Sequence, residues 1–141
     1  MIDRGPVTAA VRDLLVRFTG RPCGLGELPL VEGVPAELPY TVLYPLGGSA
    51  AGALLMDAWQ DTTLVYQVTV VAGRTDQAEW LADRVRRAVL ERTETGGWAY
   101  GLAVPGAEVW ARELLVDEGF AGESSKDGLV SGAQRFGLAV T

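Results

Sequence analysis

No histidine occurs in this sequence of 141 residues, and cysteine occurs once, as Cys23. Histidine is the commonest general base of enzymes and the commonest metal ligand, so its absence removes both roles. Without histidine, no serine can be activated as in Ser-His catalysis. A lone cysteine allows neither an intrachain disulfide nor a thiolate cluster around a metal ion. These absences predict a protein that is not an enzyme, with no catalytic residue, no metal site and no cofactor.

Basic residues are scarce, because 12 Lys and Arg stand against 18 Asp and Glu, for a formal net charge of −6. This balance argues against binding of nucleic acid by a basic surface. It is compatible with a protein that lines a passage for DNA, where repulsion keeps the polymer from adhering. No apolar run approaches the ~20 residues of a membrane span, and the charged start MIDRGPVTAAVRDLL is unlike a signal peptide. We expect a soluble protein, made in the cytoplasm, with no membrane partner.

Motifs for phosphate and calcium binding are also missing. The glycine-rich stretches at residues 24–26 and 47–49 lack the spacing of the dinucleotide and P-loop motifs. The acidic segment 117–128 misses the EF-hand spacing. Flexible or solvated turns are the better interpretation of all three.

The clearest structural signal begins at residues 62–71, TTLVYQVTVV. These residues are rich in β-branched side chains, and they alternate so that every second one is apolar. The pattern predicts a central strand with at least one buried face, and the fully apolar face carries Leu64, Tyr66, Val68 and Val70.

A helix is predicted directly after this strand. Gly73 ends the strand, and Thr75 or Asp76 can cap the helix, with Glu79 completing a capping-box pattern. Arginines gather in the later turns, as the helix dipole favours. The apolar side chains recur at helical spacing and predict one buried stripe: Ala78, Leu81, Ala82, Val85, Ala88 and Val89.

The remaining chain predicts one more helix and several strands. The N-terminal helix ends at Gly20 and has an apolar stripe of Val7, Val11, Leu14, Leu15 and Phe18. Strands are predicted at residues 40–44, 53–59, 107–116 and 129–140, and irregular segments at 21–39, 48–52, 95–106 and 117–128. We therefore predict a single domain over residues 1–141 with an α+β fold. Its mostly antiparallel sheet carries two helices on one face.

Aromatic residues provide the candidate interaction site. Trp80 lies at the margin of the helical stripe, and Trp98 and Tyr100 lie in a loop. Because aromatics are enriched at the centres of interfaces, these three residues are the candidates for a protein–protein contact. Packing at the edge of the core is the alternative for Trp80. Core packing is the expectation for Trp59 and Trp110.

Taken together, these segments resemble a known family. The short N-terminal helix, the Gly/Pro-rich loop with PYTVLYPL, the segment DTTLVYQVTVVAGRTDQAEWLADRVRRAVL and the final RFGLAVT are similar to tail terminator and tail completion (head–tail joining) proteins of long-tailed bacteriophages. The similarity covers most of the chain. Its most specific part is the strand, Gly-Arg-Thr/Asp turn and helix at residues 65–89.

The resemblance implies a structural virion protein of the tail and neck, assembled in the host cytoplasm. Such a tail terminator forms a ring, typically of six subunits, that caps the tail tube and joins it to the head-side connector. The partners implied are further copies of the chain, the tail tube protein and the connector protein, while DNA passes through the pore without specific binding. Three alternatives remain: another neck protein (head-closure or connector), a tail-tube subunit, and a small α+β enzyme or ligand-binding domain that uses carboxylates and the aromatic loop around Trp98. The segments 21–39 and 47–52 are candidates for arms that reach neighbouring subunits.

Overall fold

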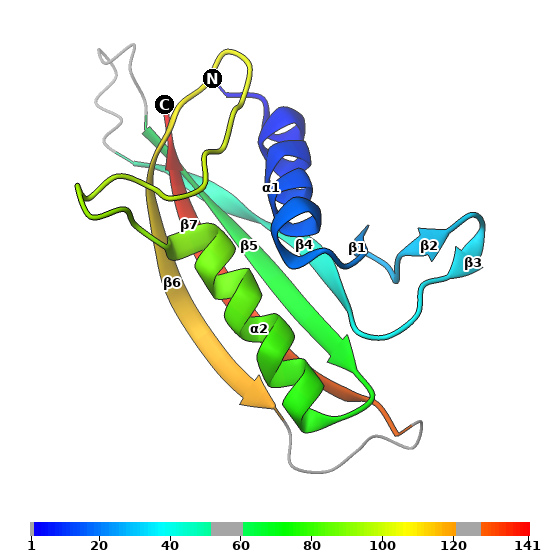
Figure 1. Ribbon diagram of the computed structural model, residues 1–141. Coiled ribbons are helices and arrows are strands. Elements are labelled where there is room, and N and C mark those ends of the chain that lie inside the picture. The colour runs from blue at the N-terminus through cyan, green and yellow to red at the C-terminus, as the bar shows by residue number, and fades with distance from the viewer. Residues whose placement is uncertain (1, 52–60, 121–127) are drawn as a thin grey trace.

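The computed structural model describes residues 2–51, 61–120 and 128–141. The elements run in the order α1 (Arg4–Thr19), β1 (Cys23–Leu25), β2 (Leu30–Val31), β3 (Val34–Pro35), β4 (Tyr40–Ala51), β5 (Asp61–Ala72), α2 (Thr75–Leu90), β6 (Val109–Phe120) and β7 (Val130–Val140). The main sheet has the order β1-β4-β5-β7-β6 and is antiparallel except for the short β1–β4 pair. Both helices lie on the same face of this sheet (Figure 1). The predicted α+β fold is confirmed.

Strand β5 lies in the middle of the sheet, and its alternating pattern is the one predicted. Leu64, Tyr66, Val68 and Val70 are buried against the helices, while the residues between them face the other side and are partly exposed. In the register with β7, Leu64 pairs with Leu138 and Tyr66 with Phe136, so the apolar faces of the two strands coincide. The core therefore forms between these two strands and the helices.

Helix α2 buries the whole predicted stripe. Its start differs from the prediction, because the N-cap residue is Arg74 and no side chain caps the helix. The side-chain oxygen of Gln77 instead accepts a hydrogen bond from the backbone N–H of Gly73 at 3.3 Å. The expected capping box of Asp76 and Glu79 is therefore wrong: Asp76 is already inside the helix and pairs with Arg74 at 3.2 Å.

Helix α1 is also buried along its predicted stripe, with Phe18 half-buried at its end. Gly20 ends the helix in the left-handed conformation, with φ of 70°, which glycine adopts without strain. A buried hydrogen bond of 2.9 Å joins the hydroxyls of Thr8 and Tyr66 and fixes α1 on β5. Burial raises the pKa of Tyr66, so this phenol is neutral at physiological pH.

Two predicted strand ends are wrong, and one predicted strand lies outside the described residues. Strand β4 does not close at Pro45 but continues to Ala51 past a bulge between Pro45 and Gly48. Gly48 passes so close to the carbonyl of Thr63 on β5 that a Cβ would clash, so it is required by strand pairing and is not a loop glycine. Strand β6 extends to Phe120. The predicted strand 53–59, with Trp59, lies outside the described residues.

The face of the sheet opposite the helices is covered by no described element. Side chains of all four long strands lie on it, and many of them are apolar: Tyr40, Val42, Tyr44, Val65, Val71, Ala133 and Leu115. An antiparallel sheet commonly has one packed face and one solvated face, and the solvated one is then mostly polar. The apolar character of this open face is what an oligomer or a larger assembly would require.

Gln134 provides a test of the core. Its side chain lies on the helix-facing side of β7, is only 3% exposed, and has no hydrogen-bond partner among the described residues for either its oxygen or its nitrogen. Replacing an unpaired buried polar group by an apolar group of similar shape removes a desolvation penalty. Gln134→Met should therefore raise the free energy of unfolding by about 1 kcal/mol in urea titrations.

The matched control is Gln67→Met on the open face. The amide of Gln67 donates to Thr69 at 3.1 Å and accepts from Arg135 at 3.1 Å. Loss of these bonds should lower the free energy of unfolding by about 1 kcal/mol. A fall in stability for Gln134→Met as well would mean that Gln134 is hydrogen-bonded.

Candidate functional site

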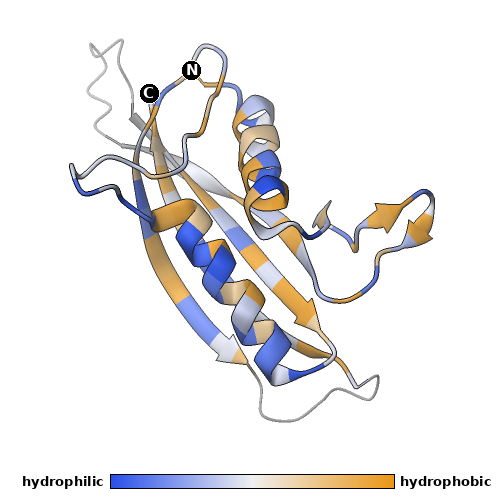
Figure 2. Ribbon diagram, in the orientation of Figure 1, coloured by the Kyte–Doolittle hydropathy of each residue, from blue (hydrophilic) through white to orange (hydrophobic). Residues whose placement is uncertain are grey.

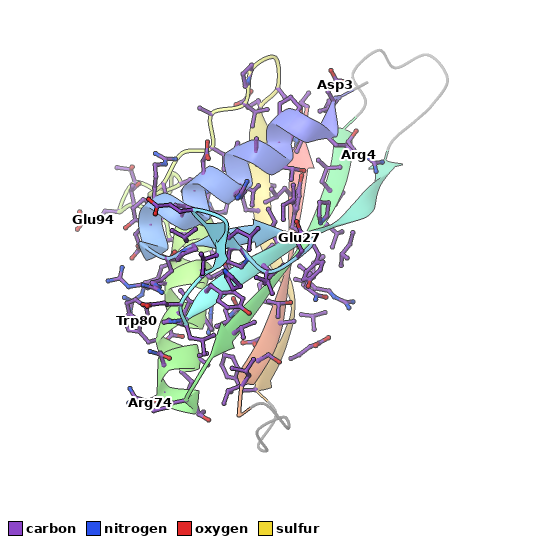
Figure 3. All side chains as sticks on the ribbon, turned by 90° about the vertical axis from the view of Figure 1, so that its right-hand side faces the viewer. Asp3, Arg4, Glu27, Arg74, Trp80 and Glu94 are labelled. Atoms are coloured by element: carbon purple, nitrogen blue, oxygen red, sulfur yellow. The ribbon has the colours of Figure 1, made fainter. Side chains whose placement is uncertain are left out.

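Of the three predicted interface residues, Trp80 is the one that is largely accessible. Its side chain is 45% exposed on the outward side of α2, away from the sheet (Figure 3). The guanidinium of Arg84, one turn further along α2, lies 4.9 Å from the centre of the indole ring. Trp80 is therefore partly exposed, as its place at the margin of the helical stripe indicates.

Two guanidinium groups contact the ring of Trp98. Arg92 lies 4.1 Å from the ring centre and Arg112 lies 4.8 Å from it. Cation–π contacts of this kind are most favourable on tryptophan. The loop is thereby packed against the end of α2 and against β6, and Trp98 is half-buried.

Tyr100 packs on the end of α1. Its ring centre lies 4.2 Å from that of Phe18, and the carbonyl of Phe18 accepts a hydrogen bond of 3.3 Å from Arg84. The carbonyl of Tyr100 accepts a hydrogen bond of 2.8 Å from Arg112. The three candidate residues therefore belong to one continuous series of contacts, which we call the aromatic–arginine ladder: Trp80, Arg84, Phe18, Tyr100, Arg112, Trp98 and Arg92.

Arg112 is the buried centre of this ladder. It is 7% exposed, and its guanidinium also donates to the carbonyl of Val89 at 3.2 Å, in the last turn of α2. The last carbonyls of a helix lack intrahelical partners and carry partial negative charge, so a cation there is favourable. Burial lowers the pKa of Arg112 to about 10, which leaves the group charged at neutral pH. Arg112 joins α2, β6 and the 91–108 loop, and its role is structural.

The described residues provide little for catalysis or metal binding. Cys23 is buried, and burial raises the pKa of its thiol, so it is not a thiolate nucleophile at neutral pH. Within the described residues no group of three or more Cys, Asp or Glu has the geometry of a metal site. A hollow of about 700 Å³ beside Trp98 is lined mainly by loop residues, and its one cation, Arg112, is bonded to backbone carbonyls.

The sequence did not reveal two exposed apolar features. Trp110 was expected in the core, but it is 52% exposed on the edge strand β6, next to a break in register between Val109 and Ala111 that turns it outward. The irregular segment 21–39 contains a hairpin, β2–β3, that projects from the body of the protein (Figure 1). The signal for this hairpin was the pair Glu32-Gly33 between valines, a two-residue turn with positive φ at both positions.

Comparison with solved structures finds several chains with a similar fold. No family model matches the chain, and no curated protein matches its sequence. A chain in the solved structure described as the virion of a native gene transfer agent particle has a similar fold, with a TM-score of 0.65 and 14% sequence identity. The likeness covers 95% of this chain and 93% of that chain. At this identity the likeness concerns the fold. Neither of the two described helices is both long and apolar enough to span a membrane.

The two arginines on Trp98 make a matched pair of tests. Arg112→Met removes hydrogen bonds to two carbonyls that stay buried, so the free energy of unfolding should fall by about 2–4 kcal/mol in urea titrations. Arg92→Met removes the other cation from the same ring, but Arg92 is exposed and donates to the carbonyl of Gly96 alone among the described hydrogen bonds. Its cost should stay below about 1 kcal/mol. Equal costs for the two variants would contradict a structural role centred on Arg112.

Proposed function

We propose that this chain is a structural, non-enzymatic protein of a virion, and specifically a tail terminator. In this proposal it acts as one domain and forms a ring, of six subunits by the family resemblance, that caps the tail tube. The ring joins the tube to the head-side connector, and DNA passes through it.

The observation that carries the proposal is the fold likeness to a virion component along nearly the whole of both chains. That likeness extends to a protein of similar length, so it is not confined to a common strand–helix motif. The family resemblance in the sequence, centred on residues 65–89, points independently to the same class of particle.

The surface of the protein supports an assembling role. The β2–β3 hairpin and the edge strand β6 expose large apolar side chains, and the open face of the sheet carries further apolar side chains that are partly exposed. Exposed apolar surface on this scale is costly for a protein that stays monomeric, and it is typical of one that is covered by partners. Strand β6 also leaves one edge of the sheet unpaired among the described strands, which invites pairing with another chain.

The net charge of −6 is consistent with a passage for DNA. A ring multiplies this charge, and a negatively charged wall repels phosphates. A basic wall would bind DNA and retard its passage, since phosphate contacts dominate such affinity.

The second candidate is another component of the same junction or tube, namely a head-closure or connector protein or a tail-tube subunit. The same fold likeness and the same exposed surfaces favour it. An enzyme or ligand-binding domain has less support, because that function calls for a concave site with convergent polar groups. The hollows among the described residues are shallow and lined mainly by surface side chains.

The proposal is tested by the mass of the purified protein in solution, measured by native mass spectrometry, together with negative-stain images of the same sample. We expect closed rings of about six subunits, with central openings, that bind to the ends of purified tail tubes. Long tubes would favour the tail-tube subunit. A monomer that also fails to bind purified tails would refute the proposal.

A further inference from the structure

The β2–β3 hairpin and its flanks, residues 27–37, form what we call the arm. The arm extends away from the sheet and the helices, and both of its strands are hydrophobic (Figures 1 and 2). Leu30, Val31 and Val34 are 60%, 51% and 63% exposed, the largest apolar exposures among the described residues apart from Trp110. These side chains contribute little to the core of their own chain. Their exposure is typical of residues that contact another molecule.

The arm is fixed at its base and free at its tip. The side chain of Arg21 donates to the carbonyls of Pro39 and Glu37 at 2.7 and 2.9 Å, and the N–H of Ala36 donates to the carbonyl of Pro29 at 2.9 Å. Beyond these bonds the strands pair over two residues each. An isolated two-stranded hairpin is marginally stable in water, and burial against a partner would stabilise it.

The charge of the arm limits the kind of partner that fits it. Between Arg21 and Arg74 the sequence has no Lys or Arg, whereas the arm carries Glu27, Glu32 and Glu37. A complementary surface should therefore combine an exposed apolar side chain with cations.

One surface of the same protein has this combination. Trp80, Arg84 and Arg87 are spaced by four and three residues along α2, so they lie on one side of the helix, and we call them the α2 stripe. Trp80 is the large apolar side chain of α2 that is most exposed. The open sheet face is less suitable, because its cation Arg135 is half-buried and bonded to Gln67, whereas Arg87 on the α2 stripe is exposed.

We infer that the arm of one copy docks on the α2 stripe of a neighbouring copy, with Leu30, Val31 and Val34 against Trp80 and the glutamates near Arg84 and Arg87. The occupant of the stripe is thus a second copy of this chain. The arm and the stripe lie on different sides of the molecule (Figures 1 and 3). Such a contact is head-to-tail, and it closes into a ring when the rotation between copies allows. This inference rests on the proposed ring and names the contact that builds it.

The first test uses three variants and native mass spectrometry. Leu30→Asp/Val34→Asp changes the arm, and Trp80→Ser changes the stripe. Either variant should convert rings into monomers at concentrations where the wild-type chain is assembled. Thermal unfolding should be nearly unchanged for both, because the altered side chains are exposed. Leu46→Asp is the matched control, since Leu46 is 47% exposed on β4 and belongs to neither surface; this variant should keep its rings.

The second test mixes the arm variant with the stripe variant. The arm variant retains an intact stripe and the stripe variant retains an intact arm, so one productive contact remains. The mixture should give a one-to-one dimer, although each variant alone is monomeric. An arm-to-arm contact would instead leave the stripe variant associated on its own and would give no mixed dimer.

Three results would overturn the inference. Rings that persist in the arm variant would leave the ring proposal intact and remove the arm from it. Monomeric variants that fail to form a dimer when mixed would show that the two surfaces do not meet. A wild-type chain that stays monomeric at millimolar concentration but binds purified tails would place the partner of the arm in another protein and preserve the proposed function.

Discussion

The burial of one face of β5 beneath two helices is the constraint on which this structure depends. Tyr66 is the centre of that contact, because its ring lies in the core beside Phe136 and its hydroxyl is hydrogen-bonded to Thr8 of α1. The same strand has its other face open, with Val65 and Val71 among its side chains. Because both helices are used on one side, nothing in the described chain remains to cover the second side. The alternating pattern of β5 therefore contributes one face to the internal core and leaves the other face of the sheet available for assembly.

The sequence predicted the elements that have a clear period. In β5 every second residue is apolar, and in α2 the buried stripe recurs at helical spacing, so these elements and their buried faces were predicted. The segment 21–39 was predicted to be irregular and a candidate arm, but its hairpin was not predicted, because strands of two residues have no period to detect. The predicted end of strand β4 was too early because Gly48 looks like a loop residue in the sequence. In the structure Gly48 is needed because a Cβ at this position would clash with the carbonyl of Thr63. A glycine required by a neighbouring strand cannot be distinguished from a flexible one without the pairing.

The interface role of the three aromatic residues stays a prediction, and the structure shows how they lie. The three aromatic residues Trp80, Trp98 and Tyr100 do lie in one connected set, but only Trp80 is presented to solvent to a large extent. Trp98 and Tyr100 are linked through Arg112, which attracted no attention in the sequence because a single arginine in a strand is usually solvated. Its burial depends on two carbonyls, of Val89 and Tyr100, that come from separate parts of the chain. Such convergence is a property of the fold and has no local signal.

The aromatic–arginine ladder makes Trp80 a better contact residue than its exposure alone indicates. Ordering a flexible surface side chain on binding costs about 0.5–1.5 kcal/mol for each residue that is rich in rotamers. Arg84 is already held by the carbonyl of Phe18, at 3.3 Å, and it lies against the ring of Trp80 before any partner arrives. Phe18 is in turn fixed by Tyr100, whose backbone carbonyl is bonded to the buried Arg112. The contacts of the ladder within the chain therefore restrict the side chains of Trp80 and Arg84 at its exposed end. A partner that contacts Trp80 and Arg84 would bind side chains that are already ordered in the folded chain. Less conformational entropy would then be lost on binding.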